Sequence, residues 1–215
     1  MAMTASPEFD ATFRHKLHLL LAWRRDVRGF RRDPLPDGTI ERLLTLACLA
    51  PSVGLSQPWR FVSVESAAQR GAVRANFANA NAAALAAETP SRAALYARLK
   101  LAGLDDAPVQ LAIFADLATA QGHCLGRRTM PEMTEYSVVA AAHTLWLAAR
   151  SEGIGVGWVS ILDPVALAGA LKVPADWKLI GYFCLGYPEE ENDVPQLERA
   201  GWEARRPAAS FLIRR

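Results

Sequence analysis

The stretch from Glu132 to Ser151 constrains the fold most, because it combines strong helical periodicity with strand-like segments on both sides. Apolar residues recur at helical spacing and form one face, made of Val138, Ala142, Leu145, Trp146 and Ala149. The preceding run Val109–Ala115 (VQLAIFA) suits a buried strand, and Ile154–Ile161 is a second strand candidate. The sequence therefore predicts a mixed α and β protein.

The remaining segments follow the same mixed pattern. Helices are expected at about residues 7–23, 36–50, 67–104 (broken near Thr89-Pro90) and 164–171. Strands are expected at 59–64 and 179–185, and from Gly186 to Arg215 the pattern fades into a Pro- and charge-rich tail. With 215 residues, 51% hydrophobic, no repeat and no linker, the chain is expected to form a single domain over residues 1–215.

A cluster of arginines with one acid inside it follows the first helix. Five arginines lie between Arg24 and Arg32, and Asp26 stands among them. Guanidinium groups are forked donors that suit a phosphate, although such a cluster is more often a solvated helix end. Asp26 has two interpretations: a group that reacts with the bound ligand, or a salt-bridge partner of Arg25 or Arg28.

Two loops are further candidates for ligand binding. The glycines of Gly153–Trp158 do not fit a dinucleotide-binding fingerprint, because a helix precedes them and a strand follows. They fit a helix C-cap followed by a strand with little bulk on one face, where a flat ligand could lie close to the backbone. The loop Ala50–Trp59 has free backbone donors and two hydroxyls between its prolines, but it suits an ordinary interhelix loop equally well.

Composition excludes several classes of function. The net charge is only +2, and the arginines lack interleaved aromatic residues, so no nucleic acid partner is expected. The three cysteines, Cys48, Cys124 and Cys184, have no metal or disulfide spacing. No segment has the length of a signal peptide core or a membrane helix. A soluble, cytoplasmic protein without a metal or a membrane partner is expected.

Four motifs taken together resemble the nitroreductase-like FMN proteins. They are RRDVR (24–28), APSVGLSQPW (50–59), GIGVGWVS (153–160) and LGYPEE (185–190), in the order and spacing of that family. The resemblance implies an α+β fold with a central, mainly antiparallel sheet flanked by helices. It also implies an intertwined homodimer with FMN at the subunit interface, whose C-terminal tail, about residues 187–215, wraps the partner.

Three positions depart from the ordinary pattern of that family. Asp26 stands where Ser is usual, Leu55 where Asn is usual, and Ser160 where Gly is usual. These departures, with Tyr96–Leu101 and Leu125–Arg127, resemble a branch of the family that consumes its flavin. The resemblance implies that reduced FMN reacts with molecular oxygen and is fragmented to erythrose 4-phosphate and 5,6-dimethylbenzimidazole, the lower ligand of vitamin B12, in cobalamin biosynthesis. A separate NAD(P)H-dependent flavin reductase would then supply the reduced FMN.

The resemblance also implies the residues of the site. Asp26 would be the catalytic base at the ribityl carbon next to the flavin ring, and Ser160 would hydrogen-bond near the reactive edge of the ring. Arg24, Arg25 and Arg28, with Arg205 from the tail, would hold the phosphate and polarise the edge of the flavin ring, and residues about 80–104 would form a helical lid that excludes water. The expected flavin contacts are Arg24, Arg25, Asp26, Val27, Arg28, Pro51, Ser52, Val53, Leu101, Gly157, Ser160 and Arg205.

Two other functions remain open from the sequence. A conventional NAD(P)H-dependent nitroreductase or flavin reductase would need room for nicotinamide over the ring, and would have Ser and Gly in place of Asp26 and Ser160. A non-enzymatic flavin-binding protein is the third possibility. Formation of 5,6-dimethylbenzimidazole from reduced FMN in air separates the three.

Overall fold

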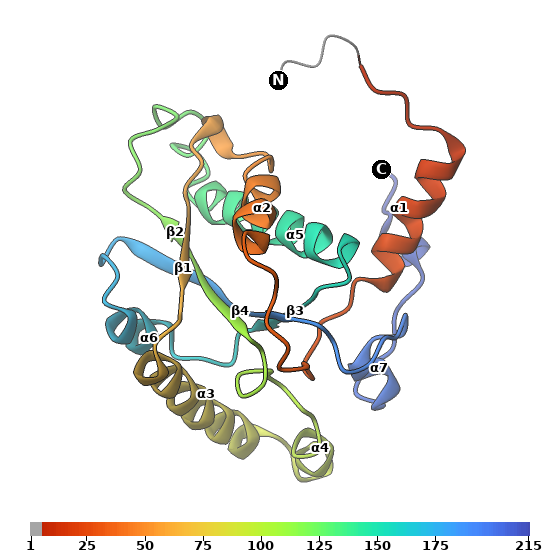
Figure 1. Ribbon diagram of the computed structural model, residues 1–215, viewed down its shortest axis with the longest axis vertical. Coiled ribbons are helices and arrows are strands. Elements are labelled where there is room, and N and C mark those ends of the chain that lie inside the picture. The colour runs from red at the N-terminus through yellow and green to blue at the C-terminus, as the bar shows by residue number, and fades with distance from the viewer. Residues whose placement is uncertain (1–5) are drawn as a thin grey trace.

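The computed structural model describes residues 6–215 and has a four-stranded sheet at its centre (Figure 1). The strands are β1 (Trp59–Ser63), β2 (Val109–Asp116), β3 (Gly155–Val159) and β4 (Trp177–Gly186). Their order across the sheet is β1-β2-β4-β3, and every neighbouring pair is antiparallel. A β-bulge interrupts the β2–β4 register between Ile113 and Phe114. The expected antiparallel sheet is confirmed.

Helices cover both faces of the sheet. The α-helices are α1 (Ala11–Trp23), α2 (Thr39–Ala47), α3 (Ala67–Ala87), α4 (Pro90–Tyr96), α5 (Met133–Ser151), α6 (Pro164–Leu171) and α7 (Gln196–Arg199). Two 3-10 turns are η1 (Val53–Leu55) and η2 (Ala208–Phe211). Helices α2 and α5 pack on one face, whereas α3 and α6 pack on the other (Figure 1). The expected α+β class with flanking helices is confirmed.

The apolar strand β2 contributes side chains to both hydrophobic cores. Its side chains alternate between the faces of the sheet. Leu111 and Ile113 belong to the core beneath α5, whereas Ala112 and Phe114 belong to the core beneath α3 and α6. Because both faces are covered, the strand is apolar at nearly every position instead of at every second one.

Local signals set the helix boundaries near their expected places. Ser66 accepts a hydrogen bond from the main chain of Gln69 and begins α3. The expected break at Thr89-Pro90 is confirmed, because Pro90 occupies the first turn of α4, where its missing N–H leaves no helical bond unmade. Asp163 and Pro164 begin α6 in the same manner.

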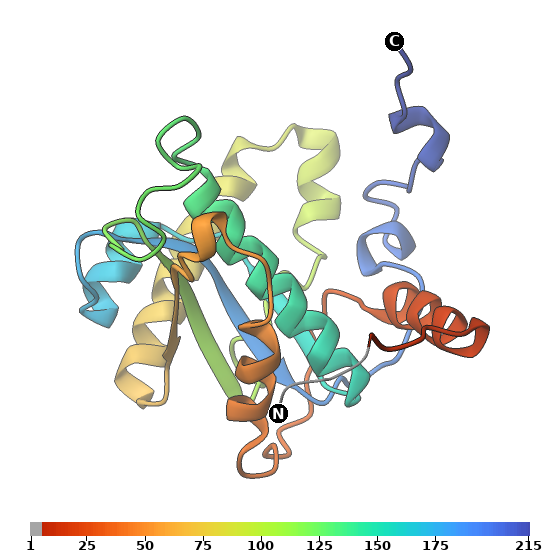
Figure 2. The ribbon, with the colours of Figure 1, turned by 90° about the horizontal axis from the view of Figure 1, so that it is seen from above.

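Helix α1 and the C-terminal tail lie beyond the sheet on the same side of the molecule (Figures 1 and 2). Within the described residues α1 has no buried side chain, although its apolar residues recur at helical spacing. The tail has more structure than its sequence pattern predicts, since it contains α7 and η2. None of the helices described here is long and apolar enough to cross a membrane.

Candidate active site

The segment after α1 packs against strand β3. It covers a face of that strand that the sequence predicted to be open. The N–H of Val27 donates to the carbonyl of Val156 at 3.0 Å, and Asp26 forms a parallel bridge with Val156. A Cβ on Gly157 would lie 2.1 Å from the Val27 carbonyl oxygen, and one on Gly155 would meet the Val27 side chain. These glycines therefore admit the chain's own Val27, and the expectation that a flat ligand lies close to the same strand stays a prediction.

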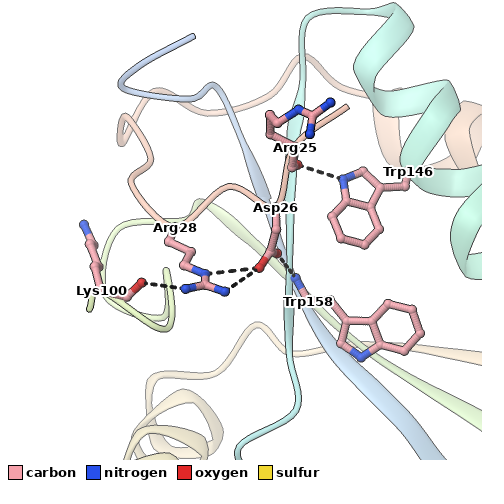
Figure 3. A network of polar contacts seen from close by, with 6 residues as sticks. All are labelled: Arg25, Asp26, Arg28, Lys100, Trp146 and Trp158. Carbon is pink, nitrogen blue, oxygen red and sulfur yellow. Dashed lines mark hydrogen bonds and ion pairs between the residues drawn. The ribbon is translucent and has the colours of Figure 1, made fainter. Parts of the chain in front are cut away.

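This docking fixes the carboxylate of Asp26 (Figure 3). Its Oδ1 accepts a hydrogen bond from the main-chain N–H of Trp158 at 2.9 Å. Its Oδ2 accepts two from Arg28, from Nε at 3.1 Å and from Nη2 at 2.9 Å. The alternative interpretation, that Asp26 forms a salt bridge with Arg28, is therefore confirmed. Asp26 is not at a helix end, however, and its side chain keeps 32% of its surface exposed.

Arg24, Arg25 and Arg205 bring three positive charges together. The guanidinium of Arg24 lies over the ring of Trp146, 4.7 Å from its centre. The pKa of Arg24 is lowered by burial, which outweighs the opposing effect of Asp26, and the charge of Arg205 lowers it further. Burial also lowers the pKa of Arg25, and Arg205 and Arg24 add to this. Each of these cations would be stabilised by an anion at this position.

Arg25 carries a further sign of an incomplete site. Its main-chain carbonyl accepts a hydrogen bond from the indole Nε1 of Trp146 at 3.2 Å, and its Nη2 donates to the carbonyl of Ala22. Its Nε is buried and has no hydrogen-bond partner among residues 6–215. Buried donors are normally satisfied. The three arginines therefore fit an anionic group such as the phosphate of FMN.

A cavity of about 210 Å³ opens beside these residues. Its lining includes Arg25, Asp26 and Arg28 of the motif, Lys100 of the lid, and Glu190 and Arg199 of the tail. Ordinary ligand pockets enclose about 300–1,000 Å³, so this cavity beside the arginines is smaller than a flavin nucleotide would require.

The loop that contains Pro51, Ser52 and Val53 lies away from the arginines. The Ser52 hydroxyl accepts a hydrogen bond from the N–H of Gln57, and the N–H of Val53 donates to Ser137 in α5 at 3.0 Å. Ser137 precedes Trp146 by nine residues, which is about 13 Å along the helix and half a turn out of phase. One chain therefore does not bring this loop and the arginine cluster to the same side of α5.

The other expected site residues lie around the same segment. Ser160 follows β3 directly, is exposed, and its hydroxyl has no hydrogen-bond partner within the described chain. Leu101 is half-buried, next to Lys100, whose carbonyl accepts from Arg28 at 3.2 Å. The expected lid corresponds to the end of α3, helix α4 and the segment up to Leu104.

Some contacts of the site were not predicted from the sequence. Trp146 was expected only as part of an apolar helix face, yet it contacts both Arg24 and Arg25. Lys100 was noted only within the lid motif, and it contributes a main-chain carbonyl, which no side-chain pattern reveals. The first of these contacts has no local sequence signal either, because Arg24 follows α1 and Trp146 lies in α5, far along the chain.

Comparisons with known proteins agree with this architecture. The sequence pattern described as "Nitroreductase family" matches residues 21–187. The chain therefore belongs to the nitroreductase family of enzymes.

Two curated relatives are more specific. The chain is 57% identical over 205 residues to the 5,6-dimethylbenzimidazole synthase of Rhodospirillum rubrum, with 95% of this chain and 97% of the relative covered. It is 48% identical to the protein of the same name from Rhodobacter capsulatus, with 93% and 96% covered. The solved structure of oxidized iodotyrosine deiodinase, bound to FMN and 3-iodo-L-tyrosine, shares the fold with a TM-score of 0.69 and 22% identity, over 82% of this chain and 91% of that one.

Proposed function

We propose that this chain is a 5,6-dimethylbenzimidazole synthase, which fragments reduced FMN in the presence of oxygen to 5,6-dimethylbenzimidazole and erythrose 4-phosphate. The names of the two curated relatives support the product. The observation that carries the proposal is the Asp26 carboxylate, held on both oxygens by Trp158 and Arg28 within the arginine cluster. An ordinary reductase of this family would have Ser there.

The arginines would bind the phosphate end of the flavin. Arg24 and Arg25 lie close enough to Arg205 for their charges to interact, and the buried Nε of Arg25 has no partner among the described residues. Reduced FMN would be the substrate, supplying both the carbon skeleton of the product and the electrons for oxygen. Fixing its phosphate would fix the position of the ribityl chain relative to Asp26.

Asp26 would accept the proton from the ribityl carbon next to the ring. Each carboxylate oxygen has two lone-pair directions, and the three observed hydrogen bonds leave at least one of them free. A carboxylate accepts protons near neutral pH, which a serine hydroxyl does not. The exposed hydroxyl of Ser160, two residues beyond Trp158, could donate or accept near the reactive edge of the ring.

The complete site would form between two copies of the chain. The loop Pro51–Val53 and the arginines contact opposite sides of α5, and the cavity in one chain is only about 210 Å³. A homodimer would bring the loop of one protomer to the arginines of its partner. The exposed apolar side chains of α1 and of the tail would be covered in such a dimer.

A direct assay tests the proposal. The protein is mixed with chemically reduced FMN, exposed to air, and 5,6-dimethylbenzimidazole is measured by chromatography and mass spectrometry. We expect product from the wild type without NAD(P)H, and a separate NAD(P)H-dependent flavin reductase should replace the chemical reductant. Fast NAD(P)H oxidation with a nitroaromatic and no benzimidazole would instead identify a reductase. Flavin binding without either reaction would identify a flavin-binding protein.

Variants of Asp26 test whether its carboxylate is the general base. Asp26→Asn keeps an acceptor for the Trp158 N–H, and Asp26→Ser restores the usual residue of the family. Both variants should bind FMN but lose product formation by about 10²–10⁴-fold, the usual contribution of a general base. The control is Asp33→Asn, because Asp33 is 60% exposed and, among residues 6–215, pairs only with Arg31. Product formation by Asp26→Asn at the wild-type rate would remove the carboxylate from the mechanism.

A further inference from the structure

The guanidinium of Arg28 lies between the Asp26 carboxylate and the main chain of the lid (Figure 3). Its Nε and Nη2 donate to Asp26 Oδ2 at 3.1 and 2.9 Å. Its Nη1 donates to the carbonyl of Lys100 at 3.2 Å. Only 12% of the side chain is exposed. Each of the three guanidinium nitrogens thus donates one hydrogen bond within the protein, and the expected contact of Arg28 with the flavin would use the two N–H groups that remain.

The neighbouring cations do not have this arrangement. Arg25 keeps a buried Nε without a partner in the described chain, and Arg205 is exposed. Arg24 contacts the ring of Trp146, which leaves its N–H donors available. None of these three arginines hydrogen-bonds the Asp26 carboxylate, whereas Arg28 commits three of its five N–H groups to Asp26 and Lys100.

The segment that Arg28 holds is the last part of the lid. At its far end, the carbonyl of Leu104 accepts from Gln110 Nε2 at 2.8 Å, and Gln110 is itself held by the Tyr182 hydroxyl at 2.7 Å. Both groups are buried in the sheet. Between these ends, a Cβ on Gly103 would lie 2.3 Å from the ring of Phe30, so the lid segment packs closely against the residues that follow Arg28.

The lid is therefore hydrogen-bonded to the sheet at Leu104, which we call its base. Lys100 lies at the other end of this segment, toward α4. The Lys100 ammonium adds an ion pair with Asp106 at 3.5 Å, but this contact does not reach Asp26. Arg28 alone joins the lid to the carboxylate in the described structure.

We propose that Arg28 is a positioning residue that aligns the Asp26 carboxylate only while the lid is closed over it. With the Lys100 carbonyl in place, the planar guanidinium is held at Nη1, and its Nε and Nη2 edge faces Oδ2. Displacement of the lid removes that support, and the carboxylate is then held by the Trp158 N–H on one side only. The role rests on the proposed function, because it assigns to Asp26 the proton transfer described above.

Measurements of flavin affinity distinguish this positioning role of Arg28 from a role in phosphate binding. Arg28→Ala should bind FMN and riboflavin within about threefold of the wild type, while its product formation falls about 10–100-fold, the effect of losing charge-assisted hydrogen bonds. Guanidinium chloride at millimolar concentration should restore part of that rate, and Arg28→Lys should restore little, because an ammonium lacks the planar fork. Loss of FMN affinity with unchanged riboflavin affinity would show a phosphate ligand and overturn the proposal.

Limited trypsin digestion tests the contact with the lid independently of catalysis. Arg98 and Lys100 are tryptic sites next to the bond from Arg28. Cleavage there should be about tenfold faster in Arg28→Ala than in the wild type, since one charge-assisted hydrogen bond holds the segment. Arg31→Ala is the matched control, because Arg31 lies on the same segment but contacts Tyr187 and Asp33 instead.

The two experiments keep the two proposals separate. If the wild type forms no benzimidazole but Arg28→Ala still exposes Arg98 and Lys100 to trypsin, the proposed function fails and the contact with the lid stands. If the wild type forms product and Arg28→Ala digests and reacts at the wild-type rate, the proposed function stands and the positioning role is wrong.

Discussion

The Oδ1 atom of Asp26 accepts the main-chain N–H of Trp158 at 2.9 Å, although 132 residues separate the two in sequence. This bond joins the arginine-rich motif to the glycine-rich motif. The position of the carboxylate is therefore set by the close packing of residues 26 and 27 against β3, and by the glycines that permit it.

Gly157→Ala should separate these two segments. The added Cβ would lie 2.1 Å from the Val27 carbonyl oxygen, a main-chain atom that cannot rotate away. We expect a loss of about 1–3 kcal/mol in the free energy of unfolding, as for other overpacked sites, together with loss of product formation. Chemical denaturation measures the first effect.

Gly169→Ala is the matched control for that substitution. Gly169 lies inside α6, and a Cβ there would have no heavy atom within 4 Å. Alanine should raise the free energy of unfolding by roughly 0.5–1 kcal/mol, because it loses less backbone entropy in a helix. Equal stability of the two variants would contradict the importance of the Val27 contact.

Arg205→Ala tests the phosphate site from the tail. Arg205 interacts electrostatically with Arg24 and Arg25. Its removal should weaken FMN binding about tenfold, the effect of one charge-assisted hydrogen bond. Riboflavin, which lacks the phosphate, should bind as it does to the wild type.

Arg206→Ala is the control, since Arg206 is its sequence neighbour and lies over the ring of Phe211 instead. Flavin fluorescence titration measures all four affinities. An equal loss of FMN and riboflavin affinity in Arg205→Ala would point to a general disturbance of the tail and would contradict a phosphate contact.

The sequence predicted the elements well, because their signals are local. The apolar run of β2, the periodic face of α5 and the proline at the start of α4 each reflect the burial or backbone geometry of the residue itself. The resemblance to a family gave the mainly antiparallel sheet, which local periodicity does not contain, whereas the strand order β1-β2-β4-β3 came from the structure alone.

What the sequence did not predict depends on contacts between distant segments. The glycines of β3 were expected to allow close approach, but the sequence did not show that Val27 is the protein group that approaches them. Arg28 was grouped with the phosphate-binding arginines because it shares their residue type. Its partners are Asp26 and the Lys100 carbonyl, so neighbouring arginines of one motif make different contacts.

Helix α1 provides a test of the proposed dimer. Phe13, Leu17 and Leu21 recur every four residues and are 44%, 39% and 46% exposed, so they form one uncovered apolar stripe. Phe13→Asp should convert a dimer into a monomer in sedimentation experiments and abolish flavin binding. His15→Glu, on the opposite side of α1, should leave both unchanged. A wild-type monomer that binds FMN tightly would contradict the two-chain site.

The buried thiol of Cys184 should make the protein sensitive to alkaline pH. Burial raises the pKa of Cys184 from 9.0 to about 12, and the thiol lies against Gly103 at the base of the lid. Because the folded pKa is the higher one, its stabilising effect is complete below pH 9 and is lost as the pH rises toward 12. The free energy of unfolding should fall in that range by up to about 1.4 kcal/mol per pH unit for this group.

Cys184→Ala isolates this contribution from that of the neighbouring tyrosine. Burial also raises the pKa of Tyr182 above its ordinary value of 10.0, so a second alkaline loss should begin only above pH 10. In Cys184→Ala the first loss should be absent and the decline should start at the later point, as measured by urea denaturation at several pH values. Cys124→Ala, which removes an exposed thiol, should follow the wild-type curve. Wild-type behaviour of Cys184→Ala between pH 9 and 10 would show that the buried thiol does not control the alkaline transition.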